Sequence, residues 1–200
     1  QGYSVFECAT DGMTLATTFF ADRDEPMKLV RVTVRNDGRT RRRLRALALE
    51  PVAIANGICF DPDGQGMYYC DSLQGRIMHA GYDAATATVS DPRVFAVIDG
   101  GAEPDGAVVD ADGRVWGAQW GAGRVVRYSA AGEVDRILPV PALQPTCVAF
   151  AGDGLGTLYV TSARDGLDVA MLQDQPTSGG VFRVSLEGAR GLPDLRFTDA

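Results

Sequence analysis

The sequence is poor in histidine, lysine and aromatic side chains. It contains one histidine, His79, one lysine, Lys28, and 8% aromatic residues. A single histidine argues against a histidine-rich zinc site and leaves little room for a Ser-His-Asp hydrolase.

Long apolar runs and paired cysteines are also missing. No apolar run approaches the roughly 18 residues of a membrane-spanning helix, so we expect no membrane partner. The four cysteines show no CxxC spacing, and the chain opens without a signal-like segment. We therefore expect reduced thiols and a cytoplasmic protein.

The charge is acidic, because 19 basic residues stand against 26 acidic ones and give a net charge of −7. A nucleic-acid binder needs a basic face, so we expect no nucleic-acid partner. Five arginines lie within residues 39–45 and could form a phosphate-binding patch. Alternation places Arg41, Arg43 and Arg45 on one face of a strand, which favours a solvated strand face instead.

The first 51 residues predict a separate β domain. Short β-rich runs at residues 3–8, 14–21, 28–35 and 41–49 are divided by turn-forming Gly, Asp and Pro. They indicate a four-stranded antiparallel meander. We expect a second domain over residues 52–200.

An internal repeat organises this second domain. The segments that begin at Asn56, Asp105 and Thr146 align in register and are spaced 49 and 41 residues apart, and each is followed by a turn and a second apolar strand. A period of 40–50 residues with four strands per repeat is typical of β-propeller blades. The sequence thus predicts an all-β chain, with a partial β-propeller of about three blades after the meander.

The start of each repeat carries an oxygen-bearing side chain. In a propeller the first strand of each blade lines the central channel, so Asn56, Asp105 and Thr146 are expected to face the axis at one mouth. Converging oxygen ligands would suit a hard cation. These residues could equally cap turns, and the pattern alone leaves both interpretations open.

Two other features favour structural roles. Residues 61–66 (DPDGQG) resemble the start of an EF-hand loop, but the twelfth position is Ser72 instead of Glu, so a hairpin turn is expected. The same Asp-x-Asp-Gly pattern recurs at residues 110–113. We expect His79 to be a packing or surface residue and not a catalytic base.

Residues 52–197 resemble the C-terminal half of the regucalcin/gluconolactonase (senescence marker protein-like) family. The segments that carry the resemblance are residues 56–60, 67–72, 104–107, 115–116, 123–128, 158–164 and 179–182. The resemblance implies a six-bladed propeller that hydrolyses sugar lactones, and in some members organophosphates, with one divalent cation (Ca, Mn, Zn or Mg). It implies that Asn56 and Asp105 are metal ligands and that Asp105 is the candidate base or nucleophile. Trp120, Arg164 and Thr146 are the candidate substrate contacts.

The chain also departs from that family. The family has a further Glu ligand in its first blade, and we find no counterpart of that segment here. Residues 2–50 instead resemble the N-terminal β-sandwich region of cellobiose phosphorylases, without their catalytic barrel. The sequence therefore reads as a fusion of two fragments, with the join near Glu50–Val52.

Half a propeller exposes strand edges and open blade faces. The N-terminal meander could serve as an extra blade, or two chains could pair with two-fold symmetry. We expect a homodimer that completes a six-bladed ring and acts on a small lactone or ester. The alternatives are a cation-binding module without catalysis and an inert truncated propeller.

Overall fold

A computed structural model describes residues 3–10, 13–21, 28–39, 52 and 54–193. The chain divides into two compact units, Gln1–Arg45 and Ala46–Ala200, and each is described by itself. Strands dominate both units, and every strand pair within a sheet is antiparallel.

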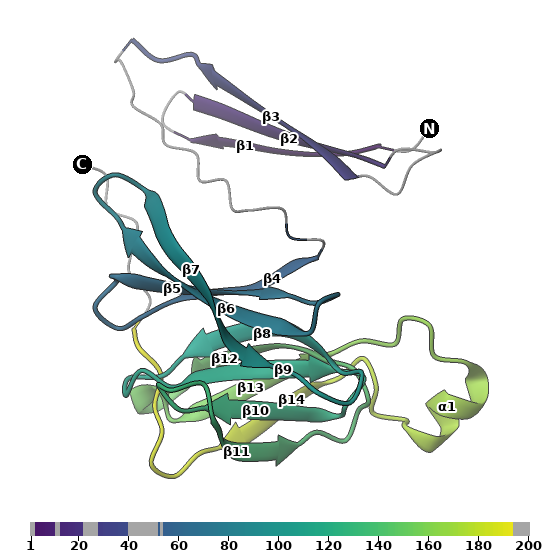
Figure 1. Ribbon diagram of the computed structural model, residues 1–200. Helices are drawn as coiled ribbons and strands as arrows, with labels where there is room; N and C mark the ends of the chain where they lie inside the picture. Colours follow the sequence, from purple (N-terminus) through teal and green to yellow (C-terminus); the bar gives the residue numbers. More distant parts are fainter. Residues whose placement is uncertain (1–2, 11–12, 22–27, 40–51, 53, 194–200) are drawn as a thin grey trace. The chain divides into compact units, whose positions relative to one another are not determined.

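The first unit holds one three-stranded sheet with the order β1-β2-β3 (Figure 1). Its strands are β1 (Tyr3–Thr10), β2 (Met13–Ala21) and β3 (Lys28–Asn36). They match the first three strands predicted from the sequence. The fourth, at residues 41–49, and most of the arginine-rich stretch lie outside the described residues.

The second unit contains three consecutive antiparallel sheets, which we call sheets 1, 2 and 3. Sheet 1 comprises β4 (Ala55–Phe60), β5 (Gly66–Asp71), β6 (Arg76–Asp83) and β7 (Thr88–Val97). Sheet 2 comprises β8 (Glu103–Val109), β9 (Val115–Trp120), β10 (Arg124–Tyr128) and β11 (Val134–Pro139). Sheet 3 comprises β12 (Pro145–Ala151), β13 (Thr157–Ser162) and β14 (Val181–Ser185).

Backbone pairing confirms the repeat. The amide of Ser72 donates to the carbonyl of Ile54 over 3.1 Å in sheet 1, and Ala163 donates to Gln144 over 2.9 Å in sheet 3. Trp120 pairs with Glu103 at the same place in sheet 2. Asn56, Asp105 and Thr146 each lie two residues further along the first strand, so they occupy equivalent positions.

A short helix, which the sequence analysis did not predict, interrupts the connection between β13 and β14. It is α1 (Val169–Asp174), and the Asp168 carboxylate caps it by accepting the amide of Met171 at 2.8 Å. A single 3₁₀ turn, Asp153–Leu155, precedes β13. Within the described part of the chain, no helix is long and apolar enough to cross a membrane.

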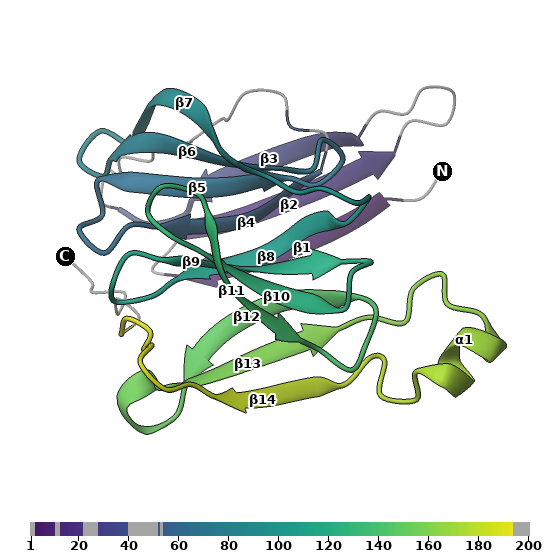
Figure 2. The same ribbon diagram turned by 60° about the horizontal axis from the view of Figure 1, so that its bottom comes forward.

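The three sheets follow one another in space in chain order (Figure 2), and their inner strands β4, β8 and β12 are neighbours. Successive side chains of a strand point to opposite faces of its sheet, so the strands of sheet 2 contribute to a core on each side. In β9, for example, Val115 faces sheet 1 and Trp116 faces sheet 3. The core between sheets 1 and 2 includes Tyr68, Cys70, Ile77, Val115, Val126 and Tyr128. The core between sheets 2 and 3 includes Trp116, Ala118, Val125, Val148, Leu158 and Val160.

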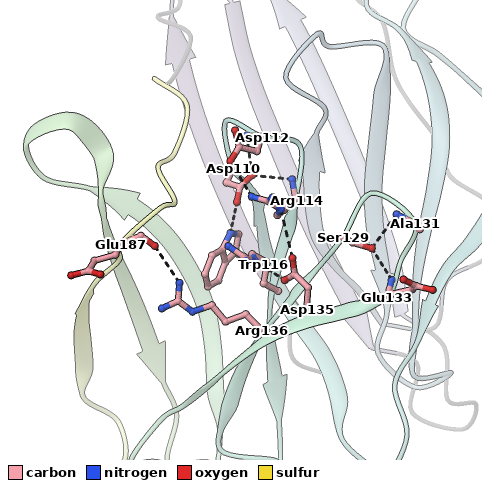
Figure 3. A network of polar contacts seen from close by, with 11 residues as sticks. Asp110, Asp112, Arg114, Trp116, Ser129, Ala131, Glu133, Asp135, Arg136 and Glu187 are labelled. Atoms are coloured by element: carbon pink, nitrogen blue, oxygen red, sulfur yellow. Dashed lines mark hydrogen bonds and ion pairs between the residues drawn. The ribbon is translucent and has the colours of Figure 1, made fainter.

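The Asp-x-Asp-Gly segments form hairpin turns, as predicted. Gly64 donates to the Asp61 carbonyl over 2.9 Å and Gly113 to the Asp110 carbonyl over 3.0 Å, and both glycines have positive φ. The Asp110 side chain is only 1% exposed. It accepts bonds from Trp116 Nε1 at 2.9 Å and from the amides of residues 112 and 114 at 3.0 and 2.9 Å (Figure 3). This carboxylate therefore ties the turn to the core between sheets 2 and 3.

Replacing Asp110 by Ala should lower the free energy of unfolding by about 3 kcal/mol, because one indole N–H and two backbone amides lose their acceptor. Urea denaturation of Asp110→Ala measures the change. The control is Asp112→Ala in the same turn, where the carboxylate is exposed and contacts Arg114 at 3.0 Å; it should change stability by no more than about 0.5 kcal/mol. Equal losses in the two variants would contradict this role for Asp110.

Candidate functional site

The inner strands β4, β8 and β12 come into close contact beside the predicted site residues, where glycines leave room for the neighbouring backbone. A Cβ atom on Gly57 would lie 2.7 Å from the Asp105 carbonyl oxygen, and one on Gly106 would lie 2.8 Å from the Cα of Cys147. Gly57 also has a positive φ of 57°. Glycine is therefore required directly after Asn56 and Asp105, and its small size brings the starts of the strands together.

Asn56 is half-buried and is held through its amide nitrogen. Its Nδ2 donates to Ser72 Oγ at 2.9 Å, and Ser72 Oγ in turn donates to the carbonyl oxygen of Pro104 at 2.6 Å. These bonds connect the starts of β4 and β8 through the end of β5. They leave Asn56 Oδ1 as the amide atom that can act as a ligand.

Asp105 is also half-buried, and its surroundings disfavour the charged carboxylate. Burial raises the pKa of Asp105 above its ordinary value, and the negative charge of Glu103 adds to this. The backbone amide of Gly106 lowers the pKa by donating to the carboxylate, but it does not offset burial. A cation at this position would stabilise the charged form.

The donor chemistry fits a hard divalent cation. An amide oxygen and a carboxylate are the ligand types that Ca²⁺ and Mg²⁺ prefer. The neighbouring thiols are poor ligands for a softer metal, because burial disfavours the thiolate form that binds metals. It raises the pKa of Cys59, and it raises that of Cys70 to about 12. Two oxygen ligands are fewer than the roughly six to eight that Ca²⁺ takes. Within the described ranges, no three His, Cys, Asp or Glu side chains form a cluster.

The candidate substrate residues lie on neighbouring segments. Thr146 is half-buried at the start of β12, with its Oγ1 2.7 Å from Thr161 Oγ1. Trp120 is half-buried at the end of β9, where it pairs with Glu103. Arg164 is exposed, and its alkyl chain lies so close to Gly179 that a Cβ there would be 2.7 Å from Cδ. In the described part of the chain, no hydrogen bond or ion pair joins these three to Asn56 or Asp105.

His79 packs within sheet 1, as predicted, and is not part of this site. Its Nε2 lies 3.2 Å from Asp61 Oδ2, and its ring centroid is 4.7 Å from that of Tyr68. Asp61 follows the far end of β4 from Asn56. The contacts of His79 therefore lie at the opposite end of β4 from the candidate ligands.

A cavity of about 400 Å³ lies between the loop after β11 and the segment after α1. Its lining includes Pro141, Leu143 and Gln175, and Gln175 Oε1 accepts the Leu143 amide at 2.6 Å. The lining contains none of the five predicted site residues. The cavity is therefore separate from the candidate ligand positions.

Ser72 contacts Asn56 but is not among the candidate residues of the sequence analysis, where it enters as the end of segment 67–72 and as a position that fails to match an EF-hand. The internal repeat does contain a signal that distinguishes Ser72. The equivalent position holds Trp120 in the second repeat and Ala163 in the third, so Ser72 is the one hydroxyl among the three. Its partner Pro104 lies 32 residues away, and local patterns do not reveal such a contact.

Consecutive antiparallel sheets with polar residues at the starts of adjoining inner strands define a β-propeller-like protein. The chain belongs to the family described as SMP-30/Gluconolactonase/LRE-like region, which matches residues 6–164. L-arabinolactonase of Azospirillum brasilense is 49% identical over 156 residues, covering 77% of this chain and 50% of that protein. Regucalcin of Bos taurus is 34% identical over 151 residues, covering 74% and 50%.

A solved structure supports the same fold. A calcium-binding protein, regucalcin, from Agrobacterium tumefaciens superposes with a TM-score of 0.68 at 31% identity, covering 90% of this chain and 59% of that one. The chain spans about half the length of the curated relatives it matches. The family match begins at residue 6, well before the expected boundary near residue 52. The cellobiose phosphorylase resemblance of residues 2–50 stays a prediction.

Gly106→Ala should destabilise the protein by about 1–3 kcal/mol, because the new Cβ would overlap the backbone of Cys147. Gly117→Ala on the paired strand β9 is the matched control, since its Cβ would have no neighbour closer than 3.9 Å. That control should be neutral or stabilising by up to about 1 kcal/mol. Urea unfolding compares the two, and a Gly106→Ala variant as stable as the wild type would contradict the close strand approach.

Proposed function

We propose that the chain forms the cation-binding part of a divalent-metal-dependent hydrolase that opens sugar lactones or related esters. The observation that carries the proposal is the linkage of Asn56 to the strand of Asp105 through Ser72 Oγ, at 2.9 and 2.6 Å. The 49% identity to an L-arabinolactonase supports the substrate class. Calcium is the favoured cation because of the oxygen ligands and the calcium-binding structural relative.

In this proposal Asn56 Oδ1 and the Asp105 carboxylate hold the cation. When bound, the cation polarises the lactone carbonyl and lowers the pKa of the attacking water. Asp105 would accept the proton from that water as the general base. Thr146, Trp120 and Arg164 contact the substrate. A phosphotriester, which has a similar polarisable oxygen, is a secondary substrate.

A second candidate function is cation binding without catalysis. The observation that favours it is the ligand count, because the described residues offer two oxygen side chains and the chain spans half the length of its relatives. Two side-chain ligands can hold a cation without positioning it against the carbonyl group of a substrate. A shared test separates the two functions, because only the hydrolase should combine metal binding with turnover.

The test is a panel of sugar lactones, aryl esters and one phosphotriester, assayed in chelator and then with Ca²⁺, Mn²⁺, Zn²⁺ or Mg²⁺. We expect turnover of lactones only with metal, and a loss of about 100-fold or more in kcat for Asp105→Ala, the size expected for removal of a general base. Asp112→Ala, in the turn at the far end of β8, should keep wild-type turnover. Metal binding without turnover would favour the second candidate, and neither binding nor turnover would favour an inert fragment.

We also propose that two copies complete a six-bladed ring. The outer face of sheet 3 supports this: Ala149, Thr161 and Val181 are exposed there, with Val181 at 65%. The corresponding face of sheet 2 is buried by sheet 3. In such a ring two Asn56 and two Asp105 would supply four oxygen side chains and replace the missing Glu ligand. In this proposal the chain has two domains: a phosphorylase-like fragment at residues 1–51 and a half propeller at residues 52–200. We further propose that the protein is cytoplasmic.

Sedimentation analysis should give twice the chain mass of 21.3 kDa. Val181→Asp should shift the protein to monomer, because it places a charge in the interface. Val169→Asp on α1 is the control, since Val169 is even more exposed, at 74%, but lies outside sheet 3. A wild-type monomer that still binds metal tightly would contradict the ring.

A further inference from the structure

We infer that Ser72 is a positioning residue that orients the Asn56 amide, so that Oδ1 and not Nδ2 faces the cation. The inference rests on the proposed function, because it assigns a role toward the same cation. The side chain of Ser72 is buried, at 3% exposure. Its hydroxyl is therefore largely shielded from water, and it has two hydrogen-bond partners in the protein, Asn56 and the Pro104 carbonyl.

The orientation follows from counting protons. A serine hydroxyl has one proton, and the Pro104 carbonyl, which can only accept, lies 2.6 Å from Ser72 Oγ. The hydroxyl proton is thus committed to Pro104. Toward Asn56 the oxygen can only accept, so the atom facing it at 2.9 Å must be the amide donor Nδ2. The carbonyl oxygen of the same amide is turned away from Ser72 and remains free for a cation.

The bond to Pro104 also connects the two ligands across sheets. Ser72 directly follows β5 of sheet 1, and its own amide is fixed by the bond to Ile54. Pro104 belongs to β8 of sheet 2, and its carbonyl is part of the peptide that leads into Asp105. One hydroxyl therefore sets the amide orientation of Asn56 and holds the backbone that carries Asp105. Trp120 and Ala163, the residues at the equivalent position, have no hydroxyl and could not do this.

Calcium titration of chelator-stripped protein by calorimetry tests the role. Removal of a group that orients a metal ligand typically costs about 10- to 100-fold in affinity, and we expect this loss for Ser72→Ala. Ser72→Thr keeps the hydroxyl and should retain most of the affinity. The matched control is Ser162→Ala in sheet 3, which removes a half-buried hydroxyl bonded to the Gly180 carbonyl at 2.9 Å; its calcium affinity should equal the wild type.

A double-mutant cycle separates orientation from general damage. In Asn56→Asp both side-chain atoms are oxygens, so either orientation presents a ligand. Adding Ser72→Ala to Asn56→Asp should then change calcium affinity by less than about threefold, although the same change costs far more beside Asn56. Equal losses in both backgrounds would show that Ser72→Ala only disturbs the fold, and would overturn the inference.

Amide NMR decides the orientation without metal. The side-chain NH₂ resonance of Asn56, assigned by its disappearance in Asn56→Asp, should shift and exchange faster with solvent in Ser72→Ala, because its acceptor is lost. An unchanged resonance would overturn the inference. A wild-type protein that binds no calcium would overturn the proposed function instead, and the Asn56 resonance would still report whether Ser72 holds the amide.

Discussion

The closeness of three inner strands is the constraint on which the second unit depends. Strands of neighbouring sheets can meet this tightly only where side chains are nearly absent, and Gly57 and Gly106 supply that at the starts of β4 and β8. Elsewhere in the same sheets, larger side chains fill the space between neighbouring sheets and form the two cores. The fold thus brings together the starts of β4 and β8, and with them the residues that precede the two glycines.

This closeness has an electrostatic consequence. A carboxylate at the narrow end is partly removed from water, and its charged form is disfavoured, as the raised pKa of Asp105 indicates. The fold does not neutralise Asp105 with an arginine or lysine among its described contacts. Its carboxylate instead accepts the backbone amide of Gly106, and the negative charge of Glu103 acts on it as well. Such an environment disfavours an unpaired negative charge, and a bound cation would stabilise it.

The sequence predicted those features that are encoded locally. Strand alternation and the positive-φ glycines Gly64 and Gly113 act over a few residues, so the hairpins and the internal repeat could be recognised. The repeat also predicted that Asn56 and Asp105 occupy equivalent positions, because it aligns the segments in which they stand. Helix α1 was missed because six residues are too few to show a helical period. The third sheet has three strands in the part of the chain the structure describes, and no local signal marked that difference from the four of its neighbours.

Ser72 illustrates the limit of local patterns. Its side chain has meaning only through Asn56, 16 residues before it, and Pro104, 32 residues after it. A serine at the end of a strand is ordinary by composition. It becomes informative when the strands are placed side by side and when its two equivalents are seen to lack a hydroxyl. Long-range hydrogen bonds of this kind are set by the packing of sheets, which sequence periodicity does not specify.

The described thiols differ in accessibility in a way that bears on chemical labelling. Cys59 and Cys70 are buried in the core between sheets 1 and 2, where the thiolate is strongly disfavoured, whereas Cys147 is exposed on β12. A bulky maleimide should therefore discriminate among these three and attach at Cys147. Because Cys147 lies against Gly106, a fluorophore carried there would sit one residue from Asp105 across the strand contact and would sense events at the candidate cation position.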